Sequence, residues 1–226
     1  MTVIAQIVSV EETMARLLLY RFLGLGYTYP ETALLEVLQA NETWDQLTAA
    51  DEVLGLGIGP TLADLQTLVE SYAGDGEQLL TDLQIEHTYL FISAVPHVPA
   101  SPYESAYTNR GLLMGEPVSQ VLRAYREAGL LMNKDYDALP DHMAAELEFM
   151  FYLVQQEAES SQSGDEDGAG VWQDRQRSFL REHLLRWGPS FLKEVTASAR
   201  QLFYGMLAAL TEAWFRSEEQ RLRVTL

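Results

Sequence analysis

LPDHMAAELEFMFYLVQQEAES, residues 139–160, is the longest stretch of the chain with a clear helical pattern. Its large apolar side chains recur at steps of three and four residues, the spacing that places them on one face of an α-helix. Pro140 suits the start of a helix, and Asp141 in the first turn complements the positive end of the helix dipole. We expect this helix to bury the face formed by Met143, Leu147, Met150, Phe151 and Val154.

Similar periodic patterns cover most of the remaining chain, and the alternating patterns of β-strands are essentially absent. Ser9 and Glu12 have the spacing of a capping box, which predicts the start of the first helix, and Gly24 and Gly26 are expected to end it. The polar stretch 161–170 predicts a loop. Three closing helices are then expected over about 171–186, 189–199 and 200–216. The sequence therefore predicts an all-α fold of about eight to ten helices.

A single helical domain accounts for residues 1–226. This length is enough to bury a sizeable core, and no repeat or sharp change of composition divides it. The proline-rich segment 94–102 is the long irregular connection inside the domain. It separates an N-terminal helical half, about 9–93, from a C-terminal helical half, about 103–216.

The composition argues against several classes of function. The chain has no cysteine, which excludes disulfides, thiolate-bound zinc and iron–sulfur centres. Its 33 acidic and 15 basic residues give a net charge of −18, which disfavours binding to nucleic acid and to anionic membranes. The sequence has no basic, apolar leader and no run of about 18 apolar residues. We therefore expect no secretory signal, no stable membrane insertion and a cytoplasmic protein.

No motif in the sequence requires catalysis or a cofactor. His142 and Glu146 are four residues apart on the expected helix and could chelate a metal ion, but two ligands do not make a site. The stretch GLGIGP, residues 55–60, lacks the preceding strand and the lysine of a phosphate-binding loop, and it is expected only to connect two helices. We expect no metal, no cofactor and no enzymatic activity.

The stretch ASPYESAYTNRG, residues 100–111, also has the features of a helix start. Ser101 and Glu104 have capping-box spacing, with a proline between them at the first helical position. This predicts a capped helix of about ten residues. Tyr103 and Tyr107 lie one turn apart on it, and they either pack in the core or line a groove with their hydroxyls available to a ligand.

His142 lies at the start of the long helix, where the helix dipole disfavours a cation. We therefore expect a neutral imidazole beside Asp141. Such a polar pair could hold a ligand rich in hydrogen-bond donors, such as a guanidinium.

These stretches together resemble a known family. Residues 102–130, PYESAYTNRGLLMGEPVSQVLRAYREAGL, followed by residues 139–157, are similar to the TorD/DmsD/NarJ family of cytoplasmic redox-enzyme maturation chaperones, most closely to its TorD-like branch. The resemblance runs from about residue 10 to residue 215 and is sharpest over 86–157. The matching elements are, in order, Tyr89-Leu90-Phe91, Pro102 to Tyr107, Gly115-Glu116-Pro117, Tyr125, Pro140-Asp141-His142 and Glu146 to Met150.

The resemblance implies a chaperone that binds the twin-arginine signal peptide, the body, or both, of a molybdopterin-containing oxidoreductase precursor. Such a chaperone assists cofactor insertion and prevents premature export. The resemblance also implies a monomer or a domain-swapped homodimer, with segment 94–102 as the hinge of the exchange. GTP binding, reported for some members, is not carried over because the chain has no phosphate-binding loop.

The resemblance also implies which residues bind the signal peptide. Two guanidiniums followed by an apolar segment call for carboxylates at one end of an apolar groove. Many relatives have Glu-Pro where this chain has Leu139-Pro140, so one acidic contact is missing or is replaced by Asp137. Asp141 and Glu104 are the carboxylates expected to meet the arginines. The full set implied by the resemblance is Pro102, Tyr103, Glu104, Ser105, Tyr107, Pro140, Asp141 and His142.

Two alternatives stay open at this point. One is a helical enzyme that binds a nucleotide or another small molecule. The other is an assembly factor that holds only the mature body of its client, without contacting the signal peptide.

Overall fold

The computed structural model describes residues 9–109, 111, 113–131 and 139–223 of the chain. In these residues the regular structure consists of helices, which confirms the predicted all-α fold class. The helices are α1 (Val10–Tyr27), α2 (Thr32–Gln39), α3 (Asn41–Leu54), α4 (Gly59–Glu70), α5 (Gly76–His87), η1 (Thr88–Ile92), α6 (Glu104–Thr108), α7 (Glu116–Glu127), α8 (Met143–Ser163), α9 (Glu166–Phe179), η2 (Leu180–Leu184), α10 (Leu185–Ser198) and α11 (Leu202–Arg221). The two elements labelled η are π-helical turns. None of the described helices is long and apolar enough to span a membrane.

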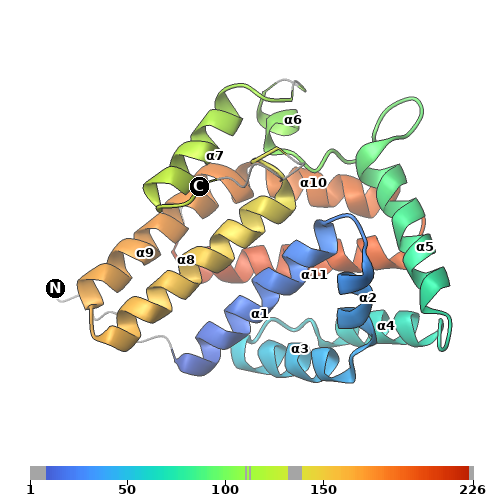
Figure 1. Cartoon of the computed structure of the whole chain (residues 1–226), viewed down its shortest axis with the longest axis horizontal. Helices are drawn as coiled ribbons and strands as arrows, with labels where there is room; N and C mark the ends of the chain where they lie inside the picture. Colours follow the sequence, from blue (N-terminus) through green and yellow to red (C-terminus); the bar gives the residue numbers. More distant parts are fainter. Residues whose placement is uncertain (1–8, 110, 112, 132–138, 224–226) are drawn as a thin grey trace.

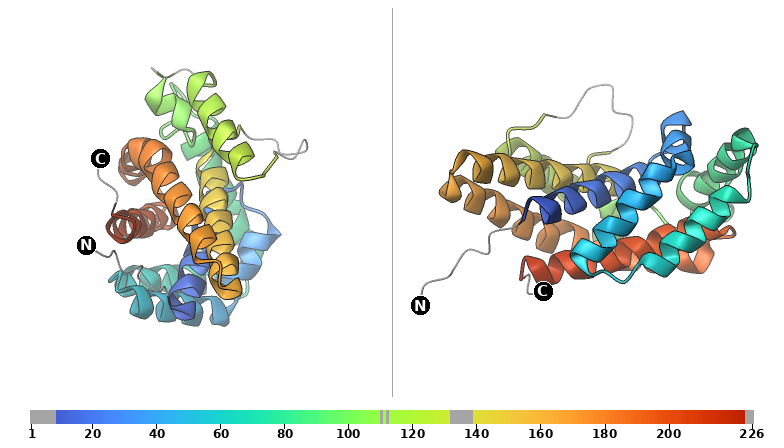
Figure 2. Two further views of the ribbon diagram at one scale, coloured as in Figure 1. Left: turned by 90° about the vertical axis from the view of Figure 1, so that its left-hand side faces the viewer. Right: turned by 90° about the horizontal axis from the view of Figure 1, so that it is seen from below.

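Helix α8 is at the centre of the molecule, with α1 packed along one side and α9 along the other (Figure 1). Helix α11 packs against α10 and lies behind α1 in the view of Figure 1, as the turned views in Figure 2 also show. The short helix α6 packs against α7 and α10, above the beginning of α8.

The longest helical pattern in the sequence predicts the core correctly at most positions. Met143, Leu147, Met150 and Val154 are fully buried. Phe151 is only half-buried, because it lies on the side of α8 that borders a surface groove. The predicted apolar face of α8 is therefore correct except at this position.

The capping box at the start of α1 is confirmed, since Ser9 and Glu12 exchange hydrogen bonds of 3.0 Å. The predicted stop at Gly24 and Gly26 is wrong, because α1 continues through both glycines to Tyr27. Gly26 allows close packing of α1 against α11. A Cβ atom on Gly26 would lie 2.8 Å from a methyl group of Leu207 on α11.

Two predicted interruptions near the C-terminal part of the chain are also wrong. The stretch 161–170 is mostly helical: α8 and α9 are separated by Gly164, at φ +79°, and by Asp165, which caps α9. No break occurs at 186–189, because the π-helical turn η2 joins α9 directly to α10 and Pro189 lies inside α10.

In the N-terminal half, the sequence patterns did not predict helix α3 as a separate element.

A buried ionic network ties α1 to α8, α9 and α11. The Arg16 guanidinium is fully buried and donates to both carboxylate oxygens of Glu218, at 3.0 and 2.7 Å. It also donates to Glu157 at 3.3 Å and to the side-chain oxygen of Gln176 at 2.7 Å. Burial alone would raise the pKa of Glu218, but the positive charges of Arg16 and Arg221 outweigh it and lower the pKa to about 2.

Candidate functional site

The two stretches singled out by the sequence lie against each other. Tyr103 and His142 form an isolated antiparallel bridge, and their rings meet edge to face with centroids 5.1 Å apart. The Glu104 backbone N–H donates to the Asp141 carbonyl at 2.9 Å, and the Met143 N–H donates to the Pro102 carbonyl at 2.9 Å. The chain segments that enter α6 and α8 therefore form one unit, and we call this unit the bridge surface.

Asp141 holds the bridge surface together from within. Its carboxylate is fully buried and accepts the backbone N–H of Ser105 at 2.8 Å, in the first turn of α6. Its other oxygen, Oδ1, has no hydrogen-bond partner among the described residues. Ser105 is also buried, and its hydroxyl accepts the backbone N–H of Met114 at 3.2 Å. Asp141 thus positions α6 instead of presenting its charge to solvent.

Glu104 does not cap its own helix, contrary to the sequence prediction. Helix α6 has only five residues and begins at Glu104 itself, so Ser101 lies outside it and makes no capping box. The Glu104 side chain is fully buried and lies 2.7 Å from Nδ1 of His183, in the π-helical turn η2. The reason is that α6 packs on α10, so its first turn faces the core.

Glu146 completes a cluster of buried acids below the bridge surface. Its Oε2 accepts the indole N–H of Trp187 at 3.1 Å. Burial raises the pKa of Glu146 well above its usual value, and the nearby charge of Glu104 raises it further. Oε1 of Glu146 and Oε1 of Glu104 both lack a donor when the two groups are treated as ionised. A proton held by Glu146 and donated to Glu104 satisfies both oxygens.

His142 is the N-cap of α8, so the helix begins at Met143 and not at Pro140 as predicted. Its Nδ1 accepts the backbone N–H of Ala144 at 3.1 Å, which requires that this nitrogen carry no proton. Burial and, to a smaller extent, the neighbouring His87 lower the pKa of His142 to about 3. The expected neutral imidazole is confirmed, although its acceptor serves its own helix.

The neutral state of His142 predicts how acid affects the stability of the fold. Because the folded pKa is about 3 and the unfolded pKa is about 6.5, the stabilising contribution is present above pH 6.5 and is lost as pH falls toward 3. Asparagine also caps helices but does not titrate. We expect the free energy of unfolding of His142→Asn to fall less steeply than wild type between pH 7 and pH 4 in urea titrations. Parallel curves for the two proteins would contradict this assignment.

The two tyrosines of the bridge surface are neither fully buried nor fully exposed. The Tyr107 hydroxyl donates to the exposed carboxylate of Glu194 at 2.5 Å, and its ring lies over Trp187 with centroids 5.6 Å apart. Burial and then this hydrogen bond raise the pKa of Tyr107. Both rings are half-buried and the Tyr107 hydroxyl is engaged by Glu194, so packing accounts for part of each side chain, and the lining of a groove stays a prediction.

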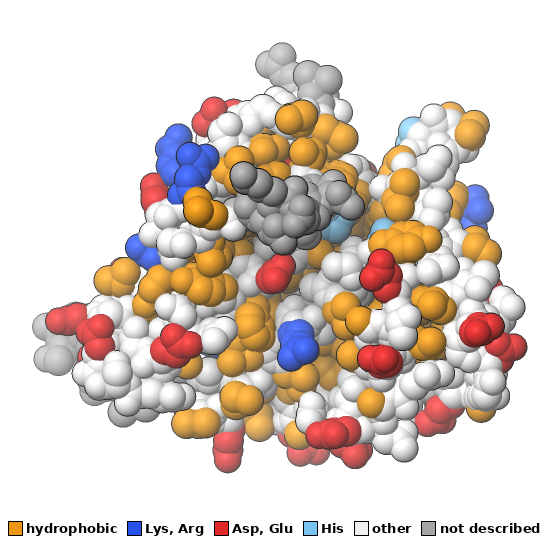
Figure 3. All heavy atoms as spheres, in the orientation of Figure 1, with side chains coloured by type: hydrophobic (Ala, Val, Ile, Leu, Met, Phe, Trp, Pro, Cys, Tyr) orange, Lys and Arg blue, Asp and Glu red, His pale blue; other side chains and the backbone are white. Residues whose placement is uncertain are grey.

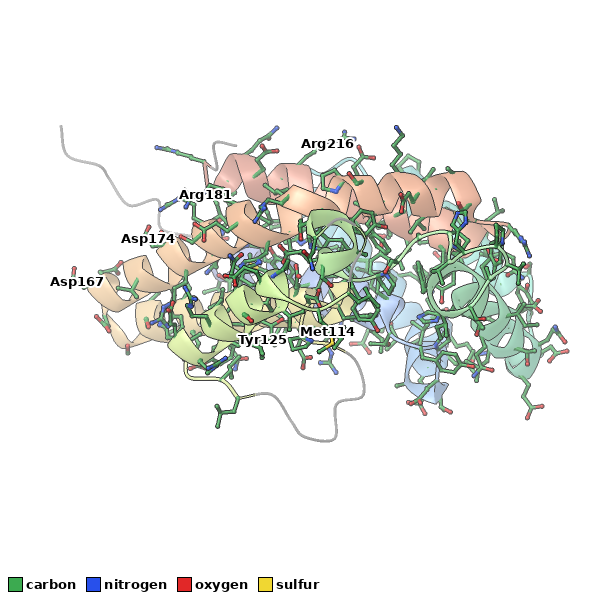
Figure 4. The ribbon with its side chains drawn as sticks, turned by 90° about the horizontal axis from the view of Figure 1, so that it is seen from above. Met114, Tyr125, Asp167, Asp174, Arg181 and Arg216 are labelled. Atoms are coloured by element: carbon green, nitrogen blue, oxygen red, sulfur yellow. The ribbon has the colours of Figure 1, made fainter. Side chains whose placement is uncertain are left out.

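Helix α7 supports the bridge surface from the side. The Tyr125 hydroxyl donates to the carbonyl of Pro140 at 2.9 Å. Figure 4 looks down on this region and shows Tyr125 and Met114 on the same side of the molecule. Met114 is exposed and is a surface residue that the sequence patterns did not identify. Asp137, the suggested replacement for a missing acidic contact, lies outside the described residues.

Sequence reasoning also missed His183, Trp187 and Glu194. They come from η2 and α10, about 80 residues after α6, and no local pattern links them to the bridge surface. His142 is the N-cap of the helix that carries Glu146, but among the described residues no group of acids and histidines is arranged to hold a metal ion.

Comparisons with known proteins place the chain in a family. A family model described as nitrate reductase delta subunit matches residues 57–193, which is more than half of the chain. The chain is 32% identical over 157 residues to the chaperone protein TorD of Photobacterium profundum, covering 66% of this chain and 69% of the relative. It is 26% identical over 217 residues to a perchlorate reductase assembly chaperone protein of Dechloromonas aromatica, covering 92% and 90%.

One further alignment covers less of the chain, and one solved structure has a lower structural similarity. The match to TorD of Vibrio cholerae, at 28% identity over 123 residues, spans about half the length of each protein, 54%. A solved structure of a redox-enzyme maturation protein from Archaeoglobus fulgidus aligns with a TM-score of 0.46 at 22% identity, covering 93% of this chain and 96% of the other. On the family-model match and the similarity to TorD of P. profundum, the chain belongs to the nitrate reductase delta subunit family, the TorD/NarJ family of redox-enzyme maturation chaperones.

Proposed function

We propose that this protein is the cytoplasmic chaperone of a molybdopterin-containing oxidoreductase precursor and binds the precursor's twin-arginine signal peptide at the bridge surface. The observation that carries the proposal is the bridge itself, which joins the Tyr103 and His142 segments into one surface. Relatives named as the chaperone protein TorD and as a perchlorate reductase assembly chaperone protein support a redox-enzyme client. Binding before export would give time for cofactor insertion.

The two acids expected to meet the arginines are buried, so other groups would have to bind the guanidiniums. Asp141 and Glu104 are fully buried, so in this conformation they position the surface instead of contacting a ligand. The accessible groups are the rings of Tyr103 and Tyr107 and the exposed carboxylate of Glu194. A guanidinium can stack on a tyrosine ring while pairing with a carboxylate. In this proposal Pro102, Ser105, Pro140 and His142 shape the surface, and the tyrosines and Glu194 bind.

The proposal predicts selectivity for arginine over lysine. A synthetic leader peptide with two adjacent arginines should bind about tenfold more tightly than its Lys-Lys counterpart in calorimetric titrations, because lysine neither stacks nor forms paired hydrogen bonds as well. Tyr103→Ala should remove most of this difference. Tyr72→Ala is the matched control, since Tyr72 is also half-buried but lies at the end of α4. Equal affinities of the wild-type protein for both peptides would overturn guanidinium recognition.

Two further measurements separate the alternatives from this proposal. A factor that holds only the mature body of its client would bind a leaderless precursor as tightly as the full one. A nucleotide-binding enzyme would show saturable GTP binding and turnover that survive Tyr103→Ala. The relatives are named as chaperones and not as catalysts, which favours the chaperone.

The oligomeric state belongs to the same proposal. Segment 94–102 connects η1 to α6 and exposes Val95 almost completely. Exchange of the helices on either side of this segment would give a domain-swapped dimer, and sedimentation at two protein concentrations would separate it from a monomer.

A further inference from the structure

Helix α6 is held in place by a small number of contacts. It has five residues, Glu104–Thr108, and a helix of this length is not stable without packing partners. The Glu104 carboxylate lies 2.7 Å from Nδ1 of His183, and the Ser105 backbone N–H donates to the Asp141 carboxylate at 2.8 Å. The position of α6 therefore depends strongly on two buried carboxylates, one on α6 itself and one just before α8.

Helix α6 covers an aromatic part of α10 (Figure 1). The centroid of the Tyr107 ring lies 5.6 Å from that of Trp187 and 6.4 Å from that of Phe191, and both of these α10 side chains are fully buried. On its outer side, the Tyr107 hydroxyl donates to the exposed carboxylate of Glu194. Movement of α6 away from α10 would therefore bring buried aromatic side chains toward solvent.

Three carboxyl groups lie buried beneath α6. Many acidic side chains of the chain lie at the surface, as on the face in Figure 3, and a carboxylate is rarely fully buried without a partner. Glu104, Asp141 and Glu146 are fully buried, and each has one oxygen with no hydrogen-bond donor among the described residues when all three are ionised. Burial and then the nearby charge of Glu104 raise the pKa of Glu146. A proton on Glu146 that is donated to Glu104 relieves this arrangement.

The basic groups around α6 do not balance the three acids. Lysine and arginine side chains on the elements packed against α6, which are α7, η2 and α10, are all exposed to solvent: Arg123, Arg126, Arg181, Arg186 and Lys193. Helix α8 has no lysine or arginine. Among the described residues, the basic group in contact with the cluster is the His183 imidazole, which pairs with Glu104.

Five further titratable side chains lie on α6 or beside it: Tyr103, Tyr107, Tyr125, His142 and Glu194. His142 is neutral above its pKa of about 3. Burial raises the pKa of Tyr103 and the pKa of Tyr107 above the usual value of a phenol. Glu146, with its raised pKa, and the imidazole of His183 are therefore the two groups beneath α6 to separate by experiment.

We propose that α6 is a latch that is kept closed by the proton shared between Glu146 and Glu104. When this proton passes to solvent, two adjacent carboxylates face each other in the core and repel. Glu146 is anchored in α8, a helix of 21 residues, so Glu104 moves and carries α6 with it. Because the closed state binds the proton more tightly than the open state, closure is favoured at low pH and release follows as the pH rises. The latch needs no client, so it stands or falls independently of the proposed function.

Hydrogen exchange of the backbone amides tests the latch. In the closed state the amides of Glu104, Ser105 and Asn109 donate hydrogen bonds. The readout is the protection of peptides that cover residues 103–109, measured by mass spectrometry on the full chain at pH 6 and pH 9 and divided by the exchange of the urea-unfolded chain at the same pH. One released proton changes an opening equilibrium by up to about tenfold per pH unit. We expect the protection of α6 to fall at least tenfold over this range, while that of α3 changes less than about twofold.

Glu146→Gln is the decisive variant. Its amide N–H₂ donates to Glu104 at every pH, so we expect α6 to remain protected at pH 9. Glu148→Gln is the matched control, because Glu148 is also on α8 but is exposed, and it should show the wild-type fall. A fall that persists in Glu146→Gln assigns the pH dependence to His183 and overturns the proposal, as does the absence of a fall in wild type.

Infrared spectroscopy of the wild-type protein gives a second measurement that depends on no variant. A protonated carboxyl group absorbs separately from an ionised one, and we expect its band to lose intensity over the same pH range in which α6 loses protection. Loss of protection while this band stays unchanged would show that another group opens α6, which also overturns the latch.

Discussion

Replacing Arg16 by leucine should lower the free energy of unfolding by about 3–5 kcal/mol, as expected when one partner of a buried ion pair is removed. Arg16 is fully buried and is the main positive charge beside Glu218, while Glu157 lies on its other side. Without the guanidinium, two carboxylates remain close together in the core. The measurement is urea unfolding at pH 7.

Arg21→Leu is the matched control for this experiment. Arg21 lies on the same helix but is exposed, so its removal should change the unfolding free energy by less than about 0.5 kcal/mol. The double variant Arg16→Leu, Glu218→Leu should recover part of the loss, because it removes both buried charges. A loss for Arg16→Leu no larger than that for Arg21→Leu would contradict the role of the network.

The same network predicts acid sensitivity. The folded pKa of Glu218 is about 2, below its usual value of 4.5, so its stabilising contribution is present above pH 4.5 and is lost as pH falls toward 2. Because Glu218 is fully buried, the difference between its usual and its folded pKa corresponds to about 3 kcal/mol. In Arg16→Leu this part of the pH dependence should become weaker, because only Arg221 then remains to lower the pKa of Glu218.

Replacing Glu104 by alanine should cost about 2–5 kcal/mol, because two buried donors, His183 Nδ1–H and the proton on Glu146, lose their acceptor. Glu146→Gln should cost less than about 1 kcal/mol. Its amide N–H₂ can replace the proton donated to Glu104, and its carbonyl can accept the Trp187 indole N–H. Glu104→Gln has no such fit, since an amide nitrogen would face one of the two donors.

The pH dependence of this pair has the opposite sign from that of Glu218. Because the folded pKa of Glu146 is raised, its contribution is complete below pH 4.5 and is lost as pH rises through the folded pKa. Glu146→Gln should therefore remove a decline of stability on the alkaline side, measured by denaturant titrations from pH 5 to pH 9. If Glu146→Gln destabilises the protein as much as Glu104→Ala, the proton is not shared in this way.

The sequence patterns predicted the helices because side-chain period follows from helix geometry alone. These patterns gave wrong helix boundaries where contacts between distant helices determine the local structure. Gly24 and Gly26 have the composition of a helix stop, but both lie inside α1, and Gly26 packs closely against Leu207 of α11. Similarly, Ser101 and Glu104 have capping-box spacing, yet the backbone enters α6 two residues later than the pattern suggests.

The sequence predicted which two stretches form the candidate site, but it did not predict which of their side chains are buried. The resemblance brought Tyr103 and His142 together, and the structure places them in contact. The burial of Glu104 could not be predicted, because its partner His183 is 79 residues away along the chain. Exposure of a carboxylate depends on which distant helix covers it, and local spacing carries no information about that.

The bond between Arg16 and Glu218 joins residues 202 positions apart in the sequence. During synthesis on a ribosome, α1 emerges long before α11, so its arginine can meet Glu157 of α8 first and Glu218 only at the end. The buried network around Arg16 is complete only after Glu218 has been translated. An incomplete chain therefore lacks the final packing between α1 and α11, and the last helix of the described chain completes the core around the first.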